Sequence, residues 1–182
     1  MARKSVVATV LALFMCAGLE AEQVCSARGG HLCTTVEWQG GCVTNPPSGT
    51  NCSFGYAPRG GACASAATSG AKFCNLGSTY DFDASRAGDQ DGLLVTGSAS
   101  LKSCYADWSG LYSATNDKLF DVTGNLRELT RAAVNSYVLM GGSYLTQSES
   151  GSACGFTFNA VDQNYRMADT GFRCCYASDP TL

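Results

Sequence analysis

The hydrophobic and polar positions divide the chain into a helical beginning, a long middle without periodicity and an end with strand signals. Residues 20–28 favour a helix with apolar side chains on one side, and Gly29 and Gly30 follow it as a C-terminal stop. A second short helix is predicted from Thr34, whose hydroxyl would cap it. Glu37, three residues further on, completes the capping box.

The middle of the chain, residues 43–118, is rich in Gly, Ser, Asn, Asp and Pro and shows little periodicity of either kind. Such a length without regular structure is unusual in a compact domain unless cross-links or ions hold it. Strand signals return afterwards, where apolar and β-branched residues lie between glycine-containing turns. They cover residues 119–122, 125–130, 137–140 and 171–176.

The first residues have the pattern of a signal peptide. Arg3 and Lys4 precede an apolar run over residues 6–13 that continues to residue 18, and small residues follow. A run of about a dozen apolar residues is too short to span a bilayer stably. We therefore expect residues 1–18 to be a signal peptide, with cleavage after Gly18 or Ala21, and no membrane span. The mature protein would be secreted, periplasmic or attached to the cell surface.

Cysteine content and charge narrow the function classes. The chain has 182 residues, enough for one domain, and eleven cysteines, of which ten remain once Cys16 leaves with the signal peptide. In an oxidising compartment ten cysteines indicate five disulfides. Zinc is not expected, because no Cys-x-x-Cys pair occurs and His31 is the only histidine. The mature chain has a net charge of about −5, so nucleic acid and anionic membranes are not expected partners.

Three segments, in order, resemble motifs of one family. They are residues 29–38 (GGHLCTTVEW), residues 120–129 (FDVTGNLREL), and residues 140–144 (MGGSY) combined with residues 169–174 (DTGFRC). These segments are similar to motifs of the formylglycine-generating enzymes, also called sulfatase-modifying factors. The resemblance covers a domain over residues 20–177, without the N-terminal part of the usual family domain. It implies a C-type-lectin-like α+β fold with little regular structure, two short N-terminal helices, small antiparallel sheets and stabilising disulfides.

The resemblance also implies a pairing of cysteines. Two pairs are carried over from secreted family members, Cys25 with Cys174 and Cys42 with Cys154. We expect Cys33 to pair with Cys175. The other four cysteines would pair locally, most simply as Cys52 with Cys63 and Cys74 with Cys104. Ten cysteines allow many connectivities, so sequence alone does not choose the local pairs.

A first calcium site is implied by the second motif. In the family this motif binds calcium through two side chains, here Asp121 and Glu128, and two backbone carbonyls, here Gly124 and Leu126. Oxygen ligands at this spacing suit a hard cation. The alternative is a turn at Gly124 and Asn125, with the two acidic residues as solvated strand positions.

A second calcium site of the family would correspond to the Asn75 side chain, the Leu76 and Leu93 carbonyls, and the Asp91 side chain. The alternative for this segment is an acidic surface loop. One or two calcium ions are therefore expected.

The family's catalytic residues do not have counterparts in this chain. Catalysis in the family requires two cysteines soon after the Gly-Gly-Ser-Tyr motif, which bind copper(I) while a substrate cysteine is oxidised by dioxygen. These positions hold Thr146 and Gly151, and neither side chain ligates copper. The nearest cysteine, Cys154, is expected in a disulfide. No catalytic residue is assigned, and copper is not expected.

These features predict a secreted, non-catalytic, calcium-stabilised binding or structural module. Its ligand, an unknown protein or glycan, would meet the segment 145–166, which retains polar and aromatic residues: Gln147, Phe156, Phe158, Asn164 and Tyr165. One alternative is a copper-dependent formylglycine-generating oxidase acting on a sulfatase cysteine. Another is a truncated paralogue without a function of its own.

Overall fold

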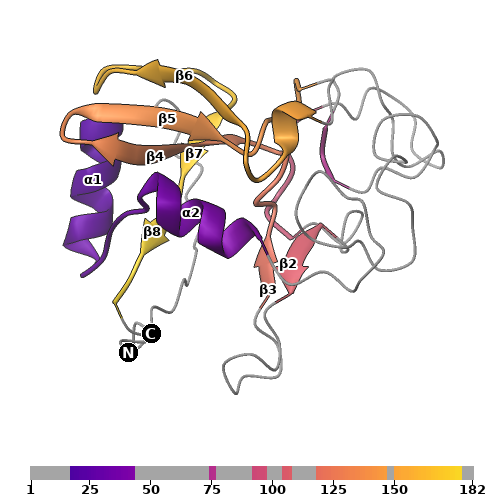
Figure 1. The fold of residues 1–182 in the computed structure, drawn as a ribbon, viewed down its shortest axis with the longest axis horizontal. Coiled ribbons are helices and arrows are strands. Elements are labelled where there is room, and N and C mark those ends of the chain that lie inside the picture. Colours follow the sequence, from indigo (N-terminus) through magenta and orange to yellow (C-terminus); the bar gives the residue numbers. More distant parts are fainter. Residues whose placement is uncertain are drawn as a thin grey trace.

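The computed structural model describes residues 17–43, 74–76, 92–97, 104–107, 118–146 and 150–177 (Figure 1). Within these residues it has two helices, two two-stranded sheets, one four-stranded mixed sheet and four disulfides. The expected α+β, disulfide-stabilised architecture is confirmed at this level. Three expected features lie outside the described residues: positions 1–16 of the expected signal peptide (residues 1–18), the Cys52–Cys63 pair and Asp91. No helix in the described part of the chain is long and apolar enough to cross a bilayer.

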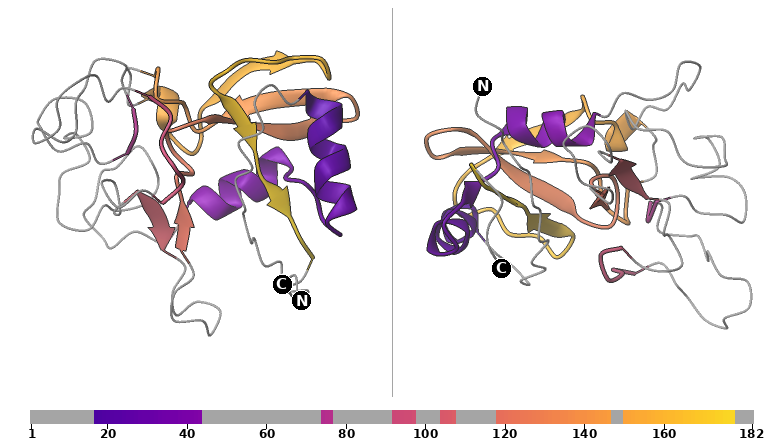
Figure 2. Two further views of the ribbon diagram at one scale, coloured as in Figure 1. Left: turned by 180° about the vertical axis from the view of Figure 1, so that it is seen from behind. Right: turned by 90° about the horizontal axis from the view of Figure 1, so that it is seen from below.

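Helix α1, Gly18–Ala27, ends where the sequence predicted. The N–H of Gly29 donates to Ser26 O at 3.0 Å, and the N–H of Gly30 donates to Cys25 O at 2.9 Å. This pair of bonds is a Schellman cap, and Gly29 adopts the left-handed φ of 76° that such a cap requires. The helix begins two residues earlier than expected. In Figures 1 and 2, α1 lies beside the turn that joins strands β4, Arg127–Ala133, and β5, Ser136–Met140.

Helix α2, Thr35–Cys42, has the predicted capping box. The Thr34 hydroxyl accepts a bond from the Glu37 N–H at 3.2 Å, and Glu37 Oε2 accepts one from the Thr34 N–H at 3.0 Å. His31 Nε2 lies 2.9 Å from the same carboxylate oxygen. Thus Glu37 holds the first turn of the helix to the residues that precede it.

The four-stranded sheet has the order β6-β5-β4-β7. Strands β4, Arg127–Ala133, and β5, Ser136–Met140, form an antiparallel hairpin, and β6, Thr157–Val161, pairs antiparallel with β5. Strand β7, Thr170–Phe172, lies parallel to β4. Because β7 and β4 run in the same direction, Arg127 and Thr170 are neighbours at one end of the sheet.

Two short antiparallel pairs complete the described elements. Strand β1, His31–Leu32, pairs with β8, Cys174–Cys175, and β2, Tyr105–Asp107, pairs with β3, Lys118–Phe120. The first pair joins the two ends of the described chain. A short 3-10 turn covers Ser150–Ser152.

The disulfides link the N-terminal helices to the end of the chain. The structure contains Cys25–Cys174, Cys33–Cys175 and Cys42–Cys154, separated by 149, 142 and 112 residues, and the shorter Cys74–Cys104, separated by 30. All four coincide with expected pairs. Such bridges typically stabilise a domain by about 2 to 4 kcal/mol each.

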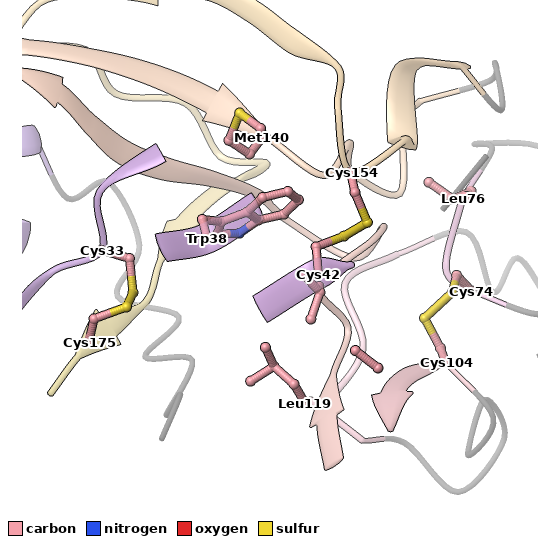
Figure 3. Close-up of a cluster of buried hydrophobic side chains, with 12 residues drawn as sticks. Cys33, Trp38, Cys42, Cys74, Leu76, Cys104, Leu119, Met140, Cys154 and Cys175 are labelled. Atoms are coloured by element: carbon pink, nitrogen blue, oxygen red, sulfur yellow. A yellow bond between two sulfur atoms is a disulfide. The ribbon is translucent and has the colours of Figure 1, made fainter. Parts of the chain in front are cut away.

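Two hydrophobic clusters form the core. The first surrounds Trp38, which lies between Met140 and the Cys42–Cys154 bridge in Figure 3. The second lies between α1 and the sheet and includes Leu32, Leu129 and Phe172. Both clusters contain disulfide sulfur atoms, so the bridges also contribute buried apolar surface.

The strand predictions needed three corrections. Residues 121–122 and 125–126 are part of a turn, because Asp121 and Asn125 have left-handed φ values of 50° and 63°. The predicted strand at 171–176 is divided into β7 and β8 at Arg173, whose side chain turns inward to an acid. Strands β1, β2 and β6 were not predicted. Strands β1 and β2 have two and three residues, and β6 is an edge strand with little burial, so none of them produces a clear pattern.

Candidate functional site: buried polar clusters around a turn

The turn over residues 121–126 brings the expected first calcium site into the protein interior. Asp121, Gly124 and Asn125 have φ values of 50°, 79° and 63°. Left-handed backbone at residues other than glycine is uncommon and is held in place only by surrounding contacts. Asp121 and Glu128 are both buried, so the alternative of two solvated strand residues is wrong.

Glu128 is neutralised by a buried arginine. Its Oε2 accepts bonds from Arg173 Nε at 2.5 Å and from Trp38 Nε1 at 2.6 Å, and Glu128 and Arg173 are only 1% and 2% exposed. Arg173 Nη2 also donates to Phe120 O at 2.8 Å. Burial raises the pKa of Glu128, whereas the charge and hydrogen bond of Arg173 oppose that shift. Arg173 therefore already supplies positive charge at this point.

Asp121 lies near the same guanidinium. Its Oδ2 accepts a bond from the Gly97 N–H at 2.7 Å. Burial raises the pKa of Asp121, and the Gly97 hydrogen bond and the Arg173 charge lower it. Among the described residues, no group of three or more His, Cys, Asp or Glu side chains surrounds one point. Of the four expected ligands, Glu128 is thus already committed to Arg173 and Trp38.

Two segments that contain ligands expected at the second calcium site, residues 74–76 and 92–97, are bonded to Asn125. The Asn75 Nδ2 donates to Gly92 O at 2.8 Å and to Asn125 Oδ1 at 3.1 Å. Asn125 also bonds both backbone groups of Leu94: its Oδ1 accepts from the N–H at 2.9 Å and its Nδ2 donates to the carbonyl at 2.9 Å. The segments 74–76 and 92–97 are thereby fixed to the turn.

One atom of this cluster lacks a partner. Asn75 is 1% exposed, and its Oδ1 has no hydrogen-bond partner within the described ranges. A buried carbonyl oxygen without a donor is costly, and an amide oxygen is a good ligand for a hard cation. Asn75 Oδ1, one of the expected ligands of the second calcium site, is therefore an oxygen of the type that calcium prefers.

Gly124 is needed for the close packing of this cluster. A Cβ at this position would lie 2.7 Å from Asn75 O, and the residue has a φ of 79°. The N–H of the next residue, Asn125, donates to the same Asn75 oxygen at 2.8 Å. Any side chain at position 124 would push the two segments apart.

A third cluster, not predicted from the sequence, lies at one end of the four-stranded sheet. Arg127 Nη2 forms an ion pair with Asp169 Oδ2, and Ser143 Oγ donates to the same oxygen at 2.8 Å. Arg127 also lies over the Phe158 ring, 5.4 Å from its centroid. The only sequence signal was the position of Asp169 just before the Gly-Phe-Arg motif, because its partners come from other strands.

The two positions that correspond to the family's catalytic cysteines come together in space. A Cβ placed on Gly142 would lie 3.2 Å from both Thr146 Oγ1 and Gly151 O. The Thr146 hydroxyl accepts a bond from the Ser143 N–H at 2.9 Å. Cys154 is bonded to Cys42, and all eight cysteines in the described residues form disulfides. Within this part of the chain there is no thiol to bind copper.

The expected ligand segment is partly exposed. Leu145 and Phe156 are exposed, as is Met167 just after the segment, whereas Phe158 and Tyr165 pack against the second hydrophobic cluster. Phe156 contacts Phe158 edge to face, with centroids 4.9 Å apart. Asn164 makes a local bond through its N–H to Asp162 Oδ1, and Gln147 lies outside the described residues.

Comparison with known proteins does not identify the family. No family model matches the chain, and no curated protein matches it. The geometry of these clusters and the motif resemblance are therefore the basis for a functional assignment.

Proposed function

We propose that the protein is a secreted, calcium-stabilised binding module of the formylglycine-generating-enzyme type that has lost the family's catalytic activity. The resemblance to this family, with its C-type-lectin-like fold, is supported by one cluster to which all three motifs contribute. Trp38 comes from the first motif, Glu128 from the second and Arg173 from the third, and the carboxylate accepts bonds from both of the others. The three segments that carry the resemblance therefore meet at one buried contact.

The observation that carries the non-catalytic assignment is the meeting of Thr146 and Gly151 at Gly142. The two positions converge there, but they offer a hydroxyl and a backbone carbonyl in place of two thiolates. Copper(I) prefers soft sulfur ligands, so this arrangement does not favour its binding. No contact in the described residues favours the oxidase alternative.

Calcium is proposed at the Asn75 cluster in preference to the Asp121 cluster. At the Asn75 cluster, a buried amide oxygen lacks a hydrogen-bond donor. At the Asp121 cluster, Arg173 already compensates the charge of Glu128. A bound calcium ion would add oxygen–metal bonds between two segments that have almost no regular structure. Asp91, the remaining expected ligand, lies outside the described residues.

The proposed ligand, a protein or a glycan, would meet the exposed part of residues 145–166. Leu145 and Phe156 supply apolar surface there. Binding sites on scaffolds of this kind are often built on loops that a rigid framework presents. The disulfides fit an extracellular or periplasmic setting, where ligands of either class occur.

A thiol count tests the proposal. The secreted protein is alkylated without reduction, and its peptides are mapped by mass spectrometry. We expect Cys154 and the other seven described cysteines to remain unmodified, and the protein not to oxidise a Cys-x-Pro-x-Arg peptide with added copper. The matched variant Thr146→Cys/Gly151→Cys is expected to gain copper(I) binding. A free pair that includes Cys154, together with copper-dependent oxidation of the peptide, would refute the non-catalytic assignment.

A further inference from the structure

We infer that Asn125 couples cation binding at Asn75 to the order of the loop 141–146, at the edge of the proposed ligand surface. This inference rests on the proposed calcium site. It concerns a connection between two sites through a single residue, whose side chain and N–H bond to one site and whose carbonyl bonds to the other.

On the cation side, the Asn125 side chain is the point where two otherwise separate segments meet. Its amide bonds both backbone groups of Leu94, as a neighbouring strand would, and its Oδ1 accepts from Asn75 Nδ2 at 3.1 Å. The Asn125 N–H donates to Asn75 O. An ion bound to Asn75 Oδ1 would therefore restrain the Asn75 side chain, whose Nδ2 donates to Asn125.

On the ligand side, the backbone of the turn is bonded to the loop after β5. The Tyr144 N–H donates to Asn125 O at 3.0 Å, and the Gly124 N–H donates to Gly141 O at 2.8 Å. The two segments are also in tight contact, because a Cβ on Gly141 would lie 2.3 Å from Val122 O. Movement of the turn therefore displaces residues 141–144.

The conformation of Asn125 makes this connection sensitive. Its left-handed φ of 63° is unfavourable for most residues and is maintained by the bonds described above. Asn125 is 3% exposed, so its amide would be left unpaired in the interior if the segment 92–97 moved away. Calcium at Asn75 stabilises that segment, the segment stabilises the Asn125 conformation, and Asn125 O fixes Tyr144.

Amide hydrogen exchange of Tyr144 reports this chain of contacts directly, because its N–H makes the bond to Asn125. We would measure exchange with calcium and with EGTA in the wild type, in Asn125→Gly and in Asn135→Gly. The first variant keeps the backbone carbonyl and tolerates positive φ, but removes the side chain. Asn135, at φ 55° in the exposed β4–β5 turn, is a matched control.

We expect calcium to slow exchange of the Tyr144 amide about tenfold in the wild type and in Asn135→Gly, and to have little effect on it in Asn125→Gly. Calorimetry with calcium alone determines binding separately. Calcium binding without protection of Tyr144 in the wild type would overturn the coupling and leave the calcium site standing. Equal protection in Asn125→Gly would show that another residue transmits it. No calcium binding would overturn both the coupling and the calcium part of the proposed function.

Discussion

The molecule has two regions that are stabilised in different ways. The disulfide-linked region comprises α1, α2, β1, β8 and the four-stranded sheet, and the loop region comprises residues 74–76, 92–97, 104–107 and 118–126, on the other side of Figure 1. The first is held by strand pairing, apolar packing and bridges between distant cysteines. The second depends on buried side-chain amides and carboxylates that bond to backbone groups, plus the Cys74–Cys104 bridge. In the loop region, polar contacts thus add to one short strand pair, β2–β3, and to the part of the first hydrophobic cluster formed by Leu76, Leu119 and Val122.

The largest predicted effect is at the buried pair of Arg173 and Glu128, whose guanidinium also bonds Phe120 O in the loop region. Arg173→Met leaves the Glu128 carboxylate buried without its cation, and we expect a loss of about 3 to 5 kcal/mol in the free energy of unfolding by urea. Adding Glu128→Leu should recover part of this loss, because the uncompensated charge is then removed. Arg131→Met, which affects an exposed pair with Glu22, is the control, with a loss under about 1 kcal/mol. A loss that small for Arg173→Met would show that the pair is not fully buried.

The next effect compares the loss of one disulfide in each region. Cys33–Cys175 lies directly beside Cys25–Cys174, so while one remains, the other closes only a short additional loop. Cys74–Cys104 closes its own loop of 30 residues. We therefore expect the pair of substitutions Cys33→Ala/Cys175→Ala to cost about 1 kcal/mol less than Cys74→Ala/Cys104→Ala, despite the greater sequence separation. Chemical denaturation of both variants measures this. A larger cost for the first pair would contradict shared loop closure.

Two glycines with similar backbone conformations allow the cost of backbone strain to be measured separately from the cost of a steric clash. Gly29 in the disulfide-linked region has open space around its missing side chain, whereas Gly124 in the loop region faces Asn75 O. Gly29→Ala should cost about 1 to 2 kcal/mol, the penalty of a left-handed alanine. Gly124→Ala should cost more, and only this variant should also weaken calcium binding, as measured by calorimetry. Equal effects on stability and unchanged calcium binding would mean that the Asn75 segment adapts to the added methyl group.

The smallest effect is the pH dependence of the α2 cap. Burial alone would raise the pKa of Glu37, but bonds from His31 and Thr34 more than offset it and lower the pKa to about 2 from 4.5. The folded state therefore gains stability from Glu37 above pH 4.5, and this gain is lost as the pH falls from 4.5 to about 2. Glu37→Gln should lower stability at neutral pH by about 1 kcal/mol and flatten the pH dependence in that window. Urea titrations at several pH values test this, and an unchanged slope would contradict it.

The distance in sequence between contacting residues explains which features could be predicted from the sequence. The α2 capping box and the glycine stop after α1 depend on residues a few positions apart, so both could be predicted. The Arg127–Asp169–Ser143 cluster could not be predicted, because its residues lie in β4, just before β7 and in the loop after β5, far apart in the sequence. In the turn 121–126, buried polar side chains replace apolar ones, which removes the hydrophobic periodicity on which strand prediction depends. The motif resemblance suggested the ligand sets there, but not that Arg173 would already serve one of them.

The adjacent cysteines of β8 constrain the order in which the protein can mature. Cys174 and Cys175 are the partners of Cys25 and Cys33, so α1 and the residue after β1 cannot obtain their covalent links until segments 149 and 142 residues further along the chain have been synthesised. Until then, the early thiols are available for incorrect pairing with one another or with those of the middle segment. Thiol–disulfide exchange takes seconds to hours and depends on oxidant and isomerase. Helix α1 is thus made long before its covalent link can form, and efficient folding of the protein should depend on disulfide-isomerising activity.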